Sequence, residues 1–148
     1  MEKKKEYYMD FAIRHLWHKI SRMYNQKANE HGVTISIGFI LLNVDKEGTP
    51  STQLGPKMGM EPTSLSRTLK AMEDNGLIYR KNDDLDKRKV LIFLTEEGVV
   101  KRKIAKDVVV GFDEKLIANI PKSKLKIFYE VAERIDKTLD EELKMINN

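Results

Sequence analysis

The stretch Met60–Gly98, MEPTSLSRTLKAMEDNGLIYRKNDDLDKRKVLIFLTEEG, decides how the rest of the chain is interpreted. Its first third carries apolar residues at i, i+4 and i+7, namely Leu65, Leu69 and Met72, so one face of an expected helix is committed to a core. A proline suits the first turn of this helix and a glycine can end it. Two short apolar runs and the start of another helix follow, and this order predicts a winged helix.

The opposite face of the same helix carries hydrogen-bond donors and cations, which are Thr63, Ser64, Ser66, Arg67 and Lys70. Arg67 and Lys70 are long enough to reach base edges in a major groove, and the three hydroxyls are expected to support them. A solvated helix face would have the same composition. The winged-helix order around it favours a recognition helix instead.

Leu77–Arg80 and Val90–Leu94 are expected strands, separated by the charged segment KNDDLDKRK. A hairpin with Asp86, Lys87 and Arg88 at its tip results. Arg88 is expected to enter a narrow minor groove, with Asp86 holding it in one orientation.

Three of these motifs, taken in order, resemble the signature of a known protein family. The segment LSRTLKAMEDNGLI, the DKR tip and the LTEEG segment that ends at Gly98 together resemble the MarR family of bacterial transcriptional regulators, whose signature has the same three parts in this order. The resemblance implies a mainly α fold with a small β wing, in which a winged helix-turn-helix is flanked by long helices that form a dimerisation body. It implies a homodimeric, sequence-specific DNA-binding regulator, expected to be a repressor. It also implies that a small aromatic effector binds between the dimer body and the winged module.

On this interpretation residues 1–148 form a single domain, with the winged helix at about 34–95 and dimerisation helices at about 5–32 and 96–146. The first helix is expected over Tyr7–His31. A second helix, Ile35–Glu47, is expected to be capped by Thr34 and closed by Gly48, with Gly38 inside it explained by close helix packing rather than by room for a ligand.

The segment Thr49–Met60 is expected to form the positioning helix, with Thr49 or Ser51 as its cap. Pro56 should shorten or kink this helix. Gln53, near its start, is expected to contact the DNA backbone.

After the wing, Thr95 can cap a long helix with an apolar stripe, and a last helix begins after Pro121. The basic cluster of Lys101, Arg102, Lys103 and Lys106 is interpreted as a solvated face. The first and the last two helices have more apolar surface than one winged module covers, which predicts a symmetric dimer. Such a dimer predicts a pseudo-palindromic operator in double-stranded DNA, with half-sites about one helical turn apart.

Composition narrows the class further. The chain has 148 residues, a net charge of +4, a pI of about 9.1 and no cysteine, and no apolar run approaches the ~20 residues that span a bilayer. A cytoplasmic protein without disulfides or thiolate metal sites is expected. No phosphate loop, nucleophile elbow or HExxH motif is present, so neither an enzyme nor a cofactor is expected.

Two groups of residues, a histidine pair and three aromatic side chains, are interpreted as structural rather than as binding sites. His15 and His18, at i and i+3, are interpreted as partly buried histidines rather than metal ligands. Trp17, Tyr24 and Phe39 are interpreted as core at least as readily as an effector site. The alternative function is a winged-helix DNA-bridging or protein-interaction module without operator specificity, which the fold alone does not distinguish.

Overall fold

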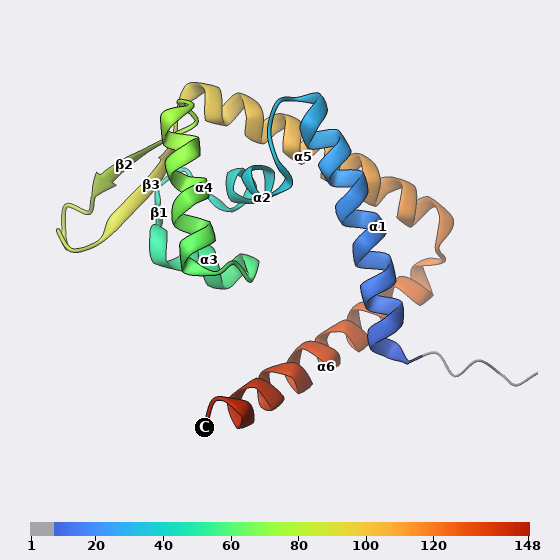
Figure 1. The fold of residues 1–148 in the computed structure, drawn as a ribbon. Helices are drawn as coiled ribbons and strands as arrows, with labels where there is room; N and C mark the ends of the chain where they lie inside the picture. Colours follow the sequence, from blue (N-terminus) through green and yellow to red (C-terminus); the bar gives the residue numbers. More distant parts are fainter. Residues whose placement is uncertain (1–7) are drawn as a thin grey trace, which may run out of the picture. The chain divides into compact units, whose positions relative to one another are not determined.

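The computed structural model describes residues 8–148, and the chain forms two compact units, one ending at Val108 and the other comprising Val109–Asn148. Helices dominate, and a small sheet belongs to the first unit (Figure 1). The elements are α1 (Met9–Glu30), α2 (Ile35–Asn43), β1 (Thr49–Pro50), α3 (Ser51–Met58), α4 (Pro62–Asp74), β2 (Ile78–Asn82), β3 (Val90–Leu94), α5 (Glu96–Asn119) and α6 (Lys122–Ile146). The expected fold, mainly helical with a small β wing, is confirmed.

The sheet has three antiparallel strands in the order β1-β3-β2. The β2–β3 ladder runs from Ile78 opposite Leu94 to Asn82 opposite Val90, so the hairpin tip lies at residues 83–89. Both expected strands exist, although β2 begins one residue later and continues to Asn82. The two-residue strand β1, in which Thr49 pairs with Ile92, was not expected.

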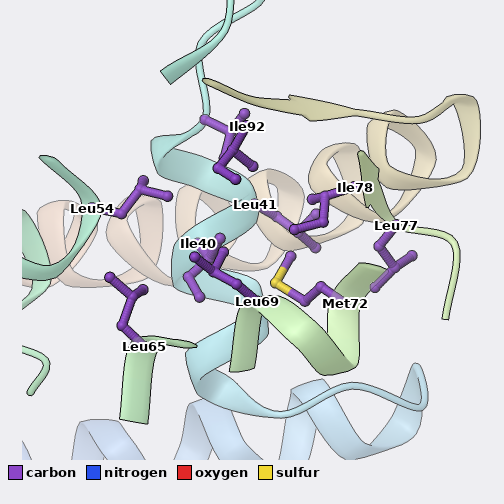
Figure 2. Packing of buried hydrophobic residues seen from close by; sticks show 10 residues of the cluster. Ile40, Leu41, Leu54, Leu65, Leu69, Met72, Leu77, Ile78 and Ile92 are labelled. Carbon is purple, nitrogen blue, oxygen red and sulfur yellow. The ribbon is translucent and has the colours of Figure 1, made fainter. Parts of the chain in front are cut away.

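The core of the first unit lies between α2, α3, α4 and the sheet. Its apolar side chains converge from all of these elements (Figure 2). The buried residues are Ile40, Leu41, Val44, Leu54, Leu65, Leu69, Met72, Leu77, Ile78 and Ile92. The i, i+4, i+7 stripe of α4 is therefore the buried stripe, as its spacing predicts.

The second helix is shorter than expected. Thr34 caps it by accepting a hydrogen bond from the Ile37 N–H at 3.3 Å, but the helix ends at Asn43 rather than Glu47. Val44 is extended, and the Asp45 N–H donates to the Thr49 hydroxyl at 2.8 Å instead of continuing the helix. Thr49 is buried, so its side chain stabilises the loop that turns into β1 and does not cap α3.

Neither of the two expected caps serves α3. Its N-cap is Pro50, without a side-chain hydrogen bond, and Thr49 and Ser51 lie in β1 and in the first turn. The helix continues through Pro56 but ends two residues later, at Met58, and Gly59 follows with a left-handed φ of +62°. A short positioning helix is the outcome that the proline predicts.

Thr95 joins three parts of the winged module. Its hydroxyl donates to the Gly76 carbonyl at 2.6 Å, just after α4, and accepts from the Gly98 N–H at 3.0 Å, in the first turn of α5. Its own N–H donates to the Leu77 carbonyl at 3.1 Å. Thr95 thus caps α5 as expected and also ties that helix to the end of α4.

Two cations of the basic cluster do not lie on a solvated face, contrary to the expectation. The Lys101 ammonium donates to the His31 carbonyl at 2.9 Å, and the Arg102 guanidinium donates to the Val44 carbonyl at 2.9 Å. Both acceptors lie at helix C-termini, where unpaired carbonyls and the helix dipole favour a cation. Lys103 and Lys106 are exposed, as expected.

The remaining helices leave apolar surface uncovered. No residue of α1 or α6 is buried, and the exposed large apolar side chains include Leu16, Trp17, Phe128, Leu139 and Leu143. Within residues 8–148, no helix combines the length and the apolarity needed to cross a membrane.

Two details of the N-terminal helix differ from expectation. It spans Met9–Glu30 in the structure, and Tyr7, where it was expected to begin, lies outside the described residues together with residues 5 and 6. His15 and His18 are exposed rather than partly buried, because they lie on a helix of which little packs against the rest of its unit.

Candidate nucleic-acid interface

The helix α4 has one buried apolar face and one exposed polar face. Leu65, Leu69 and Met72 are buried, whereas all five residues expected on the opposite face are exposed, namely Thr63, Ser64, Ser66, Arg67 and Lys70. Pro62 occupies the first turn, and Asn75 is the C-cap, followed by Gly76 with a left-handed φ of +70°. The local sequence therefore presents one polar face without disturbing the core.

The cations of this face differ in their neighbours. Lys70 lies 3.5 Å from Asp74, an exposed i, i+4 pair that contributes little to stability. Among the described residues, Arg67 forms neither an ion pair nor a side-chain hydrogen bond, so all five of its N–H donors face solvent. Arg67 is the better placed of the two to accept a new bidentate partner.

An ion pair joins the C-terminal end of α4 to the neighbouring strand β2. Glu73 accepts from the Arg80 guanidinium on β2 at 2.9 Å, which also fastens the helix to the base of the hairpin. The negative charge of Glu73 is thereby matched by a cation from the next element. The sequence placed Glu73 and Asp74 at this end but gave no sign of the Arg80 contact, because the two residues lie on different elements.

The helix-turn-helix depends on a close approach between α3 and α4. A Cβ on the buried Gly55 would lie 3.3 Å from the Leu65 side chain and 3.3 Å from the Met60 carbonyl. That carbonyl belongs to the turn, and the Met60 N–H donates back to the Gly55 carbonyl at 3.1 Å. Gly55 was missed in the sequence, where only its neighbour Pro56 drew attention. Gln53 is exposed two residues before Gly55 on α3.

The wing tip is fixed by backbone hydrogen bonds. Asp86 accepts from the Arg88 N–H at 3.1 Å through its carboxylate, and its carbonyl accepts from the Lys89 N–H at 2.9 Å. Asp86 was expected to orient the Arg88 guanidinium directly. In the structure it instead shapes the backbone from which Arg88 projects, and no ion pair joins the two side chains in the described part of the chain.

The expected site residues fall into two groups rather than one cluster. The base of the hairpin packs against α4, whereas Asp86, Lys87 and Arg88 lie at its other end, which projects away from α4 (Figure 1). A five-residue strand spans roughly 15 Å, so the wing tip is a second contact point well separated from the helix. Two separated polar surfaces can engage two grooves of one duplex.

A second feature is a recess between α1, α2 and α5 within the first unit. Its volume is about 470 Å³, including its solvent-filled mouth, and Tyr24, Phe39, Leu42 and Ile104 supply apolar and aromatic walls. Lys27, His31 and Lys101 bring polar groups to the same space. Trp17 does not line it but stacks on Phe39 at 6.4 Å between ring centroids and remains about half exposed.

Gly38 lies on the wall of this recess. No atom would lie within 4 Å of a Cβ built on it, so close helix packing does not explain this glycine in the described chain. The expectation of a packing role was wrong. Gly38 instead lines the recess, where an added methyl group would meet open space.

Comparisons with known proteins agree with this geometry. A sequence model of the MarR family matches residues 39–90, which run from α2 through the wing. An uncharacterized HTH-type transcriptional regulator of Bacillus subtilis, YwoH, is 32% identical over 120 residues, covering 75% of this chain and 86% of YwoH.

Solved structures share the fold. The Staphylococcus aureus MepR–DNA complex matches with a TM-score of 0.80 at 18% identity, covering 90% of this chain and 99% of MepR. The transcriptional regulator SlyA matches with a TM-score of 0.80 at 18% identity, covering 91% and 96% of the two chains. With the winged helix, its signature segments and these relatives taken together, the chain belongs to the MarR family of transcriptional regulators.

Proposed function

We propose that this regulator acts in the cytoplasm as a homodimer that binds a pseudo-palindromic operator and represses transcription. One observation carries the proposal: α4 exposes Arg67 and three hydroxyls on the face opposite its buried leucines. MepR, whose fold is shared, has been solved as a DNA complex, which supports the same class of partner here.

Each surface has a proposed groove. The helix α4 enters the major groove, where Arg67 is suited to bidentate contact with a guanine and Lys70 makes a looser contact once it leaves Asp74. Thr63, Ser64 and Ser66 hydrogen-bond phosphates or base edges, and Gln53 on α3 contacts the backbone.

The wing occupies the adjacent minor groove. Arg88 reads groove width through the negative potential of a narrow minor groove, and Lys87 contacts phosphate. Asp86 supports both by holding the tip backbone in one conformation. Neutralising phosphates with these cations makes the affinity salt-dependent.

The second copy of the chain covers the exposed apolar side chains of α1, α5 and α6. Leu139, Leu143 and Phe128 on α6 are each more than half exposed in the single chain. Burial of such side chains stabilises an interface by about 25 cal/mol per Å² of apolar area, before the cost of association. A twofold pair presents two copies of α4 to successive major grooves.

A small aromatic effector binds in the recess and relieves repression. Tyr24 and Phe39 offer aromatic walls suited to an aromatic ligand. Lys101 already donates to the His31 carbonyl and Lys27 lies 3.6 Å from Glu30, so these ammonium groups can share their remaining N–H donors with acceptors on the ligand. Helices α1, α2 and α5 all contribute to the recess, so a ligand there can alter how α5 is held.

The test begins with the selection of genomic fragments that bind the purified chain, followed by fluorescence anisotropy on the enriched sequence. An enriched palindrome is expected. Arg88→Ala should weaken binding by roughly 1–3 kcal/mol for each wing and reduce the salt slope of the dimer by about 2, because the substitution removes one cation from each of the two wings. Lys103→Ala removes the same charge from an exposed position on α5 and serves as the control.

Unchanged affinity of the Arg88 variant would remove the wing from the mechanism. Selection without any enriched motif would favour the DNA-bridging or protein-interaction alternative. A reporter gene under the selected operator then distinguishes repression from activation.

A further inference from the structure

Leu85 is the most exposed large apolar side chain of the described residues, with 97% of its surface accessible. Apart from Tyr79 on β2, the other exposed large apolar residues lie on or directly beside α1, α5 and α6. Leu85 instead lies on the wing tip, between β2 and β3. A dimer formed through the long helices therefore gives no reason for a leucine at this position.

The loop holds Leu85 in place. The Asp83 carboxylate accepts a hydrogen bond from the Leu85 N–H at 2.9 Å. The Asp83 N–H donates across the loop to the Lys89 carbonyl at 3.0 Å. The Asp86 carboxylate accepts from the Arg88 N–H, and the Asp86 carbonyl accepts from the Lys89 N–H. The tip is thus two successive turns closed by aspartate side chains, a geometry that presents Leu85 to solvent.

The surroundings of Leu85 favour a nucleic-acid partner. Four cations lie within four residues of it, namely Lys81, Lys87, Arg88 and Lys89. Three carboxylates lie equally near, those of Asp83, Asp84 and Asp86, so the four cations leave a net charge of +1 over this segment. The carboxylates of Asp83 and Asp86 are turned toward the loop backbone by the N–H groups that they accept. An apolar side chain between cations is complementary to a minor groove, where phosphates flank the apolar faces of the deoxyriboses.

We infer that Leu85 is a DNA-contact residue that packs against deoxyribose beside the site of Arg88 and favours base steps that open easily. The inference rests on the proposed operator binding and adds a contact that does not involve charge. Proteins that bind the minor groove insert leucine and other apolar side chains at base steps, and pyrimidine–purine steps yield at the lowest cost. Leu85 would therefore add sequence preference at positions with which Arg88 makes no base-specific contact.

The experiment compares Leu85→Ser, Leu85→Met and Arg88→Ala by anisotropy on the selected operator over a series of salt concentrations. Leu85→Ser should weaken binding about three- to tenfold, the range expected for loss of a partly buried leucine contact, with an unchanged salt slope. Arg88→Ala should reduce the slope of the dimer by about 2, one cation being lost from each wing. Leu85→Met should bind like wild type, because an apolar side chain is kept.

A second duplex sharpens the test. Replacing the flexible step under the wing with a stiff A-tract should reduce the advantage of wild type over Leu85→Ser. The narrow groove favours Arg88 equally in both proteins, so only the leucine contact distinguishes them. Thermal unfolding of Leu85→Ser should match wild type, since the side chain is not packed in the free protein.

The outcomes separate the two proposals. Selective binding by wild type with equal affinity of Leu85→Ser would overturn the role of Leu85 alone. A weaker Leu85→Ser complex with a reduced salt slope would also overturn it, because the substitution would then have acted through the cations. Binding of all duplexes alike by wild type would overturn the operator proposal and this inference with it.

Discussion

Replacing Gly98 by alanine should destabilise the protein, although alanine is the better helix former. Gly98 lies in the first turn of α5, and a Cβ on it would lie 2.0 Å from the Leu77 carbonyl oxygen and 3.1 Å from the carbonyl carbon. Both atoms belong to the backbone just before β2, so no side-chain rotation relieves the contact. Either α5 or the start of the hairpin must move by more than 1 Å to restore an ordinary contact distance.

The expected magnitude follows from three contributions. Overpacking of a well-packed site costs roughly 1–3 kcal/mol. Moving the Leu77 carbonyl weakens the hydrogen bond that it accepts from the Thr95 N–H, which contributes about 0.5–1.5 kcal/mol. The higher helix propensity of alanine offsets about 1 kcal/mol of this. The free energy of unfolding should therefore fall by roughly 0.5–3.5 kcal/mol.

The same helix supplies a matched control. Among residues 8–148, no atom would lie within 4 Å of a Cβ on Gly111, so Gly111→Ala should gain up to about 1 kcal/mol from helix propensity. Urea denaturation at one fixed protein concentration compares the midpoints of the two variants and wild type, and the concentration matters because a dimer is expected. Opposite shifts of the two midpoints are predicted.

If Gly98→Ala proved as stable as wild type, or if both substitutions shifted the midpoint the same way, the steric argument would be refuted. Propensity alone would then explain both glycines.

Three further predictions concern α5, the recess and α6. Arg102→Met keeps the aliphatic stem but loses the hydrogen bond to the Val44 carbonyl, so urea denaturation should show a free energy of unfolding lower by roughly 1–2 kcal/mol. The control Lys103→Met, at an exposed position, should change it by less than about 0.5 kcal/mol. Gly38→Ala should raise the free energy of unfolding by up to about 1 kcal/mol through helix propensity. The new methyl group narrows the recess, so calorimetric titration with an aromatic carboxylate should show weaker binding. Equal affinity would remove Gly38 from the proposed effector site. Leu139→Glu should convert the proposed dimer into monomers in analytical ultracentrifugation and reduce operator affinity, and a dimer that persists unchanged would exclude this part of α6 from the interface.

Local patterns in the sequence were enough to predict the winged module. The stripe of Leu65, Leu69 and Met72 gave the buried face of α4, the two apolar runs gave the hairpin, and Thr34 and Thr95 gave two helix caps. In each case the signal and the structure involve residues close together in the chain. The DNA contacts, the domain limits and the dimer helices remain predictions.

Features that depend on distant residues were missed. Strand β1 is two residues long and has no periodicity of its own, since it exists through pairing with residues near Ile92. The Lys101 contact with the His31 carbonyl joins positions 70 residues apart, so the composition of the basic cluster could not reveal it. The clash that makes Gly98 necessary likewise involves Leu77, on a different element.

The hydroxyl of Thr95 has both of its hydrogen-bonding roles committed, one toward Gly76 and one toward Gly98. Serine could keep both roles, whereas valine, of nearly the same shape, could keep neither. One side chain therefore links the end of α4 to the first turn of α5, and Thr95→Val would leave both the Gly76 carbonyl and the Gly98 N–H without this partner.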